Sequence, residues 1–342
     1  MQFAWMLCLA GVLVADSDAK KPEAVDDALR ARCLKVLRGA LDKGPGGTRF
    51  RAAEYLLSLD YSDGVTDAFQ ADLERASRQP SERIALWSLL AREAGESPRA
   101  KTWTTKIRDV AIDSKAPDQL RALEALARLR YKVPRDDLAR FTKLLADGTD
   151  VVPVYADWVL LNSGQPDAER RLVDDFLKHG NEATVAAAAY VLSQISTLSD
   201  DARQTLLKTA DNEAAYTSIR MKMALAAARH AQGPEQNRWI ERLRDYARDG
   251  TDEQRLLAVE GLAALGRPDD VPLLSNCLVD ANPDLSAAAA WALLRIGRRT
   301  PCVLGVWSWV VIVVSLLATV AVGWYCCIRA MRPKGICPAG AR

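Results

Sequence analysis

The sequence predicts an all-α protein: a right-handed α-solenoid of about eight helix-pair repeats, with one transmembrane helix near its C-terminus. The first observation is a period close to 34 residues, because helical patterns are followed at that spacing by Pro98, Pro134, Pro166, Ser199, Pro234, Pro268 and Pro301. The second is a tetrapeptide, Asp-Gly-Thr-Asp, which occurs at residues 147–150 and again at 249–252, three periods later. The third is that no segment shows the sustained apolar–polar alternation of a β-strand.

Each repeat is expected to contain two short helices. The first carries apolar residues at i, i+3 and i+4 spacing, in the segments Asp136–Ala146, Glu169–His179, Asp201–Thr209, Glu235–Ala247 and Asp270–Val279. Asp-Gly, His-Gly and Asn-Pro dipeptides then interrupt the helical pattern. The second helix is rich in Ala and Leu, which form helices well and allow close packing, in the segments that begin at Gln119, Thr184, Gln254 and Leu285.

Two of these second-helix segments, Asp252–Gly266 and Asn282–Gly297, resemble the second helix of HEAT repeats in the short form found in bilin lyases. The likeness covers residues 26–299, and sequence divergence before about residue 65 fits a capping repeat. The period equals that of tetratricopeptide repeats, but their Trp, Leu-Gly, Tyr and Phe pattern is absent. The resemblance implies a ladder in which a repeated arginine bonds to an acid in an inter-helix turn, with Asp118 and Asp252 as candidate acids and Arg51, Arg83, Arg121, Arg220 and Arg255 as the arginines.

Both ends of the chain are apolar. Residues 3–15 are uncharged and suit the core of a cleaved signal peptide, which is expected to be residues 1–15, although no Lys or Arg precedes them. Residues 302–328 are also uncharged, and 27 residues of helix span about 40 Å, enough to cross a bilayer. We therefore expect a transmembrane helix at 302–328, followed by a short basic tail at 329–342.

Composition narrows the classes of function. The chain of 342 residues has 46 Lys and Arg against 44 Asp and Glu, and four of those bases lie in the last fourteen residues. The rest of the chain is therefore close to neutral, which argues against nucleic-acid binding. Between the apolar ends there are two cysteines, Cys33 and Cys277, so a disulfide framework is not expected.

Residues that carry chemistry are few, and we predict no enzyme. The two histidines, His179 and His230, each end a predicted helix and are expected to cap it or to lie at the surface. Most of the paired acids are expected to start first helices and cap them; the pairs are Asp26-Asp27, Asp136-Asp137, Asp174-Asp175, Asp200-Asp201 and Asp269-Asp270. Aromatic residues recur within second helices, where core packing is favoured over a partner surface, at Trp87, Trp158, Tyr190 and Trp291. The sequence nominates no catalytic, cofactor-binding or metal-binding residue, requires no cofactor, and leaves the partner-binding residues unassigned.

These observations favour a membrane-anchored scaffold or accessory subunit that recruits a membrane-associated protein partner through a curved solenoid surface. The expected location is a single-pass bacterial membrane protein, with the solenoid in the periplasm and the tail in the cytoplasm. Two alternatives stay open. One is a bilin-lyase-like enzyme or chaperone, and the other is a cytoplasmic tail-anchored adaptor.

Overall fold

The computed structural model describes residues 25–70, 73–211 and 217–299, and the chain up to Gly297 forms one compact unit. The expected signal peptide (1–15), transmembrane helix (302–328) and basic tail (329–342) lie outside the described residues. Among the helices that the structure describes, none combines the length and the apolar character needed to cross a bilayer.

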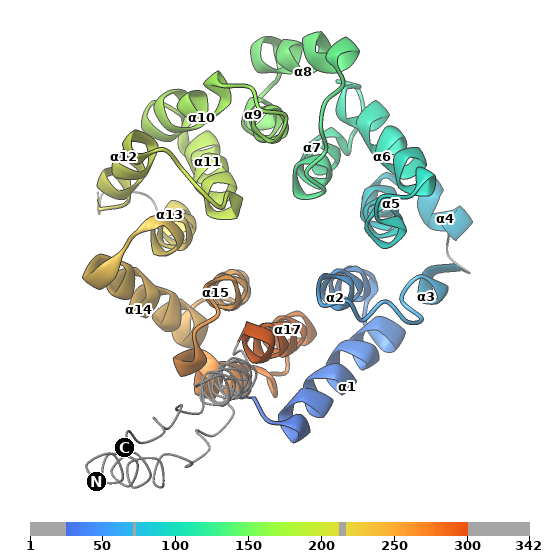
Figure 1. The fold of residues 1–342 in the computed structure, drawn as a ribbon, viewed down its shortest axis with the longest axis vertical. Helices are drawn as coiled ribbons and strands as arrows, with labels where there is room; N and C mark the ends of the chain where they lie inside the picture. The colour runs from blue at the N-terminus through green and yellow to red at the C-terminus, as the bar shows by residue number, and fades with distance from the viewer. Residues whose placement is uncertain (1–24, 71–72, 212–216, 300–342) are drawn as a thin grey trace, which may run out of the picture. The chain divides into compact units, whose positions relative to one another are not determined.

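The described residues are helical and contain no strand, which confirms the all-α prediction. Eight helix pairs follow one another along the described chain, each with an outer and an inner member (Figure 1). The inner helices are α2 (Gly46–Ser58), α5 (Pro80–Ala94), α7 (Gln119–Arg128), α9 (Val152–Asn162), α11 (Glu182–Gln194), α13 (Thr217–His230), α15 (Asp252–Leu265) and α17 (Pro283–Arg299). The outer helices are α1 (Asp27–Lys43), α3 (Asp67–Gln70), α4 (Leu73–Arg78), α6 (Pro98–Ala111), α8 (Arg135–Asp147), α10 (Asp167–Arg170), the π-helix η1 (Arg171–Lys178), α12 (Asp200–Ala210), α14 (Gly233–Asp249), the 3₁₀ turn η2 (Pro268–Asp270) and α16 (Val271–Cys277).

The repeat boundaries lie close to where the sequence predicts them. Pro98 is the first residue of α6, Pro134 caps α8, and Pro268 opens η2. The prolines thus start the outer helix of the next pair, where a missing N–H costs nothing. One expected helix differs in type, because the predicted segment Glu169–His179 forms α10 followed by the π-helix η1.

Alanine allows the inner helices to pack tightly against one another. Ala287, Ala288, Ala289 and Ala290 of α17 have no solvent exposure, and the equivalent alanines of α11 and α13 are also buried. Each inner helix contacts its own outer helix and the inner helices on both sides, from α2 through α5, α7, α9, α11 and α13 to α15. A helix enclosed on three sides needs small apolar residues on most of its surface, which explains the Ala-rich composition.

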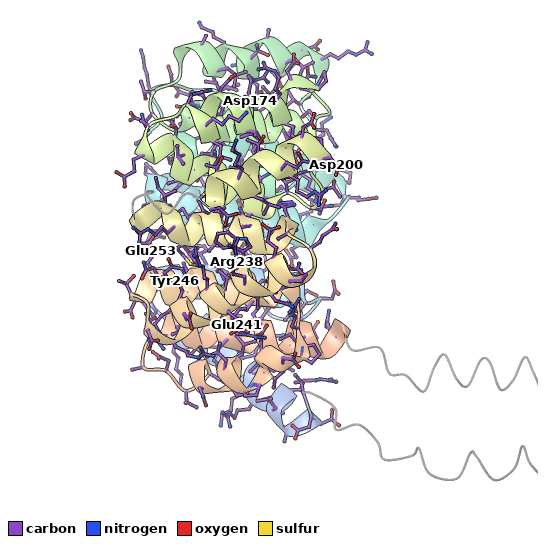
Figure 2. The ribbon with its side chains drawn as sticks, turned by 90° about the vertical axis from the view of Figure 1, so that its left-hand side faces the viewer. Asp174, Asp200, Arg238, Glu241, Tyr246 and Glu253 are labelled. Atoms are coloured by element: carbon purple, nitrogen blue, oxygen red, sulfur yellow. The ribbon has the colours of Figure 1, made fainter. Side chains whose placement is uncertain are left out.

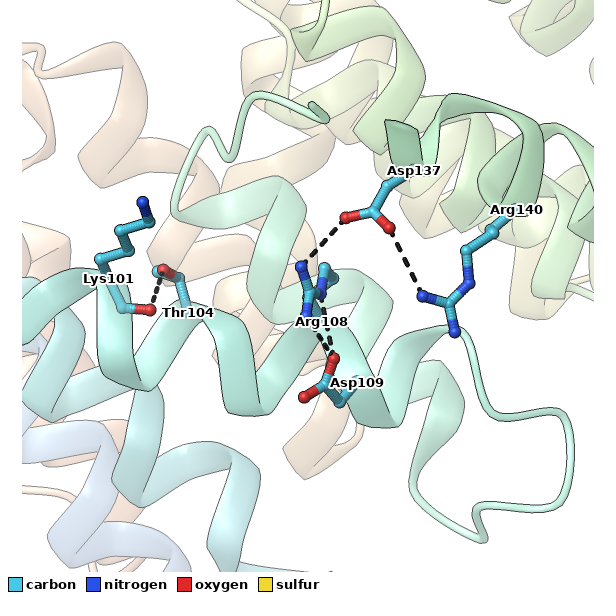
Figure 3. Close-up of polar contacts among 6 residues, drawn as sticks. All are labelled: Lys101, Thr104, Arg108, Asp109, Asp137 and Arg140. Carbon is cyan, nitrogen blue, oxygen red and sulfur yellow. Dashed lines mark hydrogen bonds and ion pairs between the residues drawn. The ribbon is translucent and has the colours of Figure 1, made fainter. Parts of the chain in front are cut away.

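Ion pairs also link successive pairs. In the outer layer, Arg108 of α6 binds Asp137 of α8 at 3.1 Å and its own neighbour Asp109 at 2.6 Å, while Arg140 contacts Asp137 at 3.4 Å (Figure 3). At the inner helices, Arg83 binds Asp118 at 2.6 Å and Arg255 binds Asp280 at 2.6 Å.

The predicted arginine ladder is therefore present in part: Arg83 binds Asp118 as expected, whereas Arg121 donates to the backbone carbonyl of Ser81 and not to an acid. Two other predicted members also differ. Asp280 of the next pair, and not Asp252, accepts Arg255. Arg49, and not Arg51, lies at the position of Arg255: both are the fourth residue of an inner helix, and both donate Nε to a carbonyl eight residues earlier, that of Leu41 at 3.1 Å and of Ala247 at 3.3 Å. Side-chain polarity alone did not distinguish Arg49 from Arg51 in the sequence.

The row of pairs closes on itself, because α17 packs against the first pair (Figure 1). Asp284 at the start of α17 accepts a hydrogen bond from the hydroxyl of Thr48 at 2.7 Å and forms an ion pair with Arg51 at 2.7 Å. Trp291 stacks on Tyr55 with ring centroids 4.8 Å apart and donates its Nε1–H to Ser58 at 2.9 Å. We call this arrangement the helical ring, and the space inside its eight inner helices the lumen.

Closure corrects one expectation, that each repeat contacts only its neighbours along an open stack. Contacts such as Thr48 with Asp284 join residues 236 positions apart. The physical reason is cumulative: when every pair is rotated in the same sense relative to the one before, a sufficient number of pairs brings the ends together.

Candidate functional site

A cavity of about 830 Å³ lies within the lumen. Every inner helix contributes to its wall, and the contributing residues lie mainly in the C-terminal halves of those helices. We call it the lumen cavity. Its volume is in the range of ligand-binding pockets. Its lining includes six basic residues, three acidic residues and four aromatic residues: Arg92, Arg128, Arg130, Lys132, Arg229, Arg295, Glu54, Glu169, Glu260, Tyr55, Trp158, Tyr190 and Trp291.

One polar network joins helices that are not neighbours in the ring. Arg128 of α7 donates to the hydroxyl of Tyr190 of α11, and that hydroxyl donates to Glu124 of α7 at 2.8 Å. Arg128 also contacts Glu124 at 3.0 Å and Glu54 of α2 at 3.9 Å. The side chain of Arg128 is 38% exposed, and the space that it is exposed to is the lumen cavity. The network therefore ties α2, α7 and α11 together across the lumen.

A second group lies where the ring closes. Tyr55 of α2 donates to Glu260 of α15 at 2.5 Å, and its ring stacks on Trp291 of α17. The guanidinium of Arg295 lies 5.3 Å from the centre of the Trp291 ring. Such contacts between a cation and an aromatic face are favourable, and this one helps to fix the position of the indole. The indole of Trp291 is thus held by Tyr55 and Arg295, and the partly exposed remainder of the side chain lines the lumen cavity.

The lumen groups hold their protons firmly at neutral pH. Burial, and then the neighbouring Glu260, raise the pKa of Tyr55 well above its ordinary value. Burial also raises the pKa of Tyr190. Burial by itself disfavours the charged form of Arg128, but Tyr190, Glu124 and Glu54 more than offset this, so the pKa of Arg128 is also raised. These groups therefore stay neutral tyrosines and a charged arginine near pH 7, a condition suited to binding and poor for proton transfer.

The aromatic residues singled out in the sequence divide between core and lumen. Trp87 is buried, with Arg83 and Lys106 over its ring, and it does not line the lumen cavity. Trp158 is 4% exposed and packs edge-on against Tyr190 at 6.3 Å. Trp158, Tyr190 and Trp291 all reach the lumen cavity. The core interpretation holds for Trp87, whereas the other three residues serve both packing and the cavity wall.

The histidines occupy different environments. His179 is exposed at the end of η1, as expected. His230 is 7% exposed, and its Nε2 lies 2.8 Å from the carbonyl of Leu192 on the neighbouring inner helix, so the expected surface or capping role is wrong for this residue. Burial lowers the pKa of His230. Within the described ranges, no group of His, Cys, Asp and Glu has a geometry that could hold a metal ion, and Cys33 and Cys277 are both buried and unpaired.

Two of the strongest ion pairs were missed by sequence reasoning or assigned another role. Asp157 of α9 has no exposure and accepts both Nε and Nη2 of Arg171, the closest contact being 2.6 Å. Asp270, read as a helix-capping acid, is 1% exposed and binds Arg244 at 2.6 Å. Asp26 does cap α1, accepting from the Leu29 N–H at 2.7 Å. An acid inside the apolar run at 152–161 was the available signal for Asp157.

The outer surface is charged with both signs. Figure 2 shows this face around α12 and α14. Within each of these helices, an acid forms an ion pair with a nearby base: Asp200 with Arg203 at 2.8 Å in α12, and Glu241 with Arg244 at 2.5 Å in α14. Exposed pairs of this kind contribute little to stability. The large apolar side chains that are exposed in the described part of the chain are Leu120 and Val279. The described part of the outer surface therefore offers no broad apolar patch. The lumen cavity, which is concave and lined by aromatic and charged side chains, is the better candidate for a binding site. Comparison with protein-family models and with curated proteins finds no match to this chain.

Proposed function

We propose that this protein is a non-catalytic, membrane-anchored scaffold that binds a segment of a protein partner in the lumen of its helical ring. The observation that carries the proposal is the composition of the lumen cavity: eight inner helices place aromatic and charged side chains around one space, and Tyr55 and Arg128 keep their protons near neutral pH. Aromatic residues and arginine dominate the energetics of protein interfaces.

Three expectations from the sequence are part of the same proposal. The repeats are HEAT-like solenoid units that have closed into a ring. The apolar segment 302–328 anchors the ring to a membrane, because it follows the end of α17 after two residues. The ring lies outside the cytoplasm of a bacterium, with the tail 329–342 inside. Anchoring raises the effective concentration of the lumen for partners in the same membrane.

Site-specific photocrosslinking in cell membranes tests the binding proposal. A crosslinking amino acid replaces Gln194, an exposed residue of the lumen cavity wall, and in a control chain it replaces Lys208 on the outer helix α12. The proposal predicts a discrete partner adduct, identified by mass spectrometry, from position 194 and none from position 208. The same adducts from both positions, or none from position 194, would contradict a lumen-binding scaffold.

A topology reporter fused to Arg342 tests the orientation. A cytoplasmic readout agrees with an exported ring. A readout on the opposite side would favour the cytoplasmic tail-anchored adaptor, and the binding proposal would then apply to a cytoplasmic partner.

A further inference from the structure

We infer that the lumen cavity receives an acidic segment of polypeptide, and that Arg92 and Arg130 are the residues that bind its carboxylates. The inference rests on the proposed function and names the chemistry of the bound segment. The two arginines belong to adjacent inner helices: Arg92 is in the last turn of α5, and Arg130 follows the end of α7. Both line the lumen cavity.

Arg92 and Arg130 differ from the other lumen charges in their partners. Neither guanidinium makes a hydrogen bond or an ion pair with the residues that the structure describes. Each guanidinium has five N–H donors, and a matched acceptor is a carboxylate, which binds two of them in parallel. Two such groups on adjacent helices therefore present a site for acidic side chains.

The acids of the lumen cavity are already engaged. Glu260 accepts the hydroxyl of Tyr55 at 2.5 Å, Glu54 lies 3.9 Å from Arg128, and Glu169 accepts the backbone N–H of Ser199 at 3.0 Å. These carboxylates are held by partners other than Arg92 and Arg130. None of these three carboxylates forms an ion pair with either arginine.

The backbone at Arg130 adds a second observation. Arg130 has a φ of 54°, in the left-handed region, where its N–H binds the Ala127 carbonyl. Gly164 has the same place after α9, with a φ of 77° and the equivalent bond to Leu161. Glycine adopts this conformation without strain, whereas a long side chain does not. Asp60 has the same place after α2, with a φ of 53° and the equivalent bond to Leu57, so this position holds a charged residue in two repeats.

Helix dipoles account for part of this arrangement. The C-terminal ends of α5 and α7 carry partial negative charge, which favours cations in their last turns. That effect stabilises the charge of Arg92, but it supplies no acceptor for the N–H groups of either guanidinium. The dipoles therefore explain why bases are tolerated here and leave their hydrogen-bonding capacity unused.

The remaining wall suits a peptide. Asn162 and Gln194 present amides, Thr197 presents a hydroxyl, and Trp291 is partly exposed at the cavity wall. Amides and hydroxyls can bond to peptide groups, and the edge of an indole ring can contact an apolar side chain. This wall would bind best a peptide segment in which acidic residues stand next to an apolar residue.

Fluorescence anisotropy with defined peptides tests the inference. The probes are fluorescein-labelled octaglutamate, octaglutamine and octalysine, and the protein is the full chain in detergent at low ionic strength. Octaglutamate is expected to bind, the other two are not, and raised salt should weaken the binding. The double variant R92Q/R130Q should bind octaglutamate at least tenfold more weakly, because each lost charged contact corresponds to about tenfold or more.

The matched control removes two charges from outer helices. R32Q/K208Q alters exposed bases of α1 and α12 and should change the affinity by less than about twofold. Equal binding of octaglutamine, no binding of octaglutamate, or an equal loss in the control variant would overturn the inference. Circular dichroism confirms that each variant is folded, and since Arg92 and Arg130 have no partners, their replacement should leave the melting temperature unchanged.

This experiment separates the inference from the proposed function. If R92Q/R130Q still gives the partner adduct from position 194 while octaglutamate fails to bind the parent chain, the scaffold stands and the acidic segment is rejected. If octaglutamate binds as expected but no adduct forms, the chemistry of the lumen stands and the protein partner is rejected.

Discussion

Asp284 joins the last helix pair to the first, so its replacement tests whether the helical ring is closed. Its Oδ1 accepts the hydroxyl of Thr48 at 2.7 Å, and its Oδ2 lies 2.7 Å from Nη1 of Arg51. Asp284→Ala removes both contacts. The same substitution at Asp280 removes the contact with Arg255, which links two pairs that are consecutive in the chain, and provides a matched comparison.

The expected loss follows from the burial of the two partners. Thr48 is 2% exposed, and a buried hydroxyl left without an acceptor costs about 1–3 kcal/mol. The side chains of Arg51 and Asp284 are 31% and 35% exposed, so solvent screening reduces their ion pair to roughly 0.5–1 kcal/mol. Asp284→Ala should therefore lower the free energy of unfolding by about 2–4 kcal/mol.

Urea unfolding of the full chain in detergent, followed by circular dichroism, measures this loss. A double-mutant cycle with Thr48→Val isolates the contact, and a coupling energy of about 1–2 kcal/mol is expected. In an open stack the two residues would lie on opposite end faces, far apart. A loss within about 0.5 kcal/mol, with no coupling to Thr48, would therefore refute closure.

Two further predictions concern single residues of the ring. Burial, opposed by Arg171, raises the pKa of Asp157 to about 6 from 3.8, so the folded state binds a proton more tightly than the unfolded chain does. The stabilisation from this group is full below about pH 4 and is lost as the pH rises through about 6. Between pH 7 and pH 4.5, the free energy of unfolding of the parent chain should therefore rise by about 2 kcal/mol relative to that of Asp157→Asn. Urea titrations at both pH values measure that difference, and identical pH dependence in the two proteins would contradict the pKa. Gly148 and Gly39 should respond to alanine with opposite signs, because a Cβ on Gly148 would lie 2.3 Å from the carbonyl oxygen of Leu144, whereas a Cβ on Gly39, exposed in α1, meets nothing within 4 Å. Gly148→Ala should cost about 1–3 kcal/mol and Gly39→Ala should stabilise by roughly 0.5–1 kcal/mol, as measured by thermal unfolding; a stabilising Gly148→Ala would show that the helix end is not confined.

The local structure of this protein could be read from its sequence because it is set by local chemistry. Helices predicted to begin at Asp136 and Asp201 begin at Arg135 and Asp200. Proline, capping acids and the 34-residue period act over a few residues, and they fixed those boundaries. The π-helix η1 was not foreseen, since one additional residue per turn leaves little trace in an apolar pattern.

The lumen could not be predicted in the same way. Residues such as Glu54, Arg128 and Tyr190 come together because helices two pairs apart face one another across the lumen. That meeting depends on the rotation between successive pairs, which is a property of packing and not of any one repeat. Arg92 and Arg130 likewise looked like ordinary helix-end bases until their helices were placed side by side.

Closure also changes how the scaffold proposal must be tested. In an open stack, central repeats can be deleted and the remaining units still pack, because each unit depends on its neighbours alone. In the helical ring, deleting three pairs would also separate Trp291 from Tyr55 and Asp284 from Thr48, so the Ala-rich faces of α2 and α17 would lose their cover. Loss of a partner after such a deletion would follow from unfolding as readily as from a missing contact. Point substitutions inside the lumen, at residues that support no other side chain, are therefore the informative experiments, and Arg92 and Arg130 are residues of this kind.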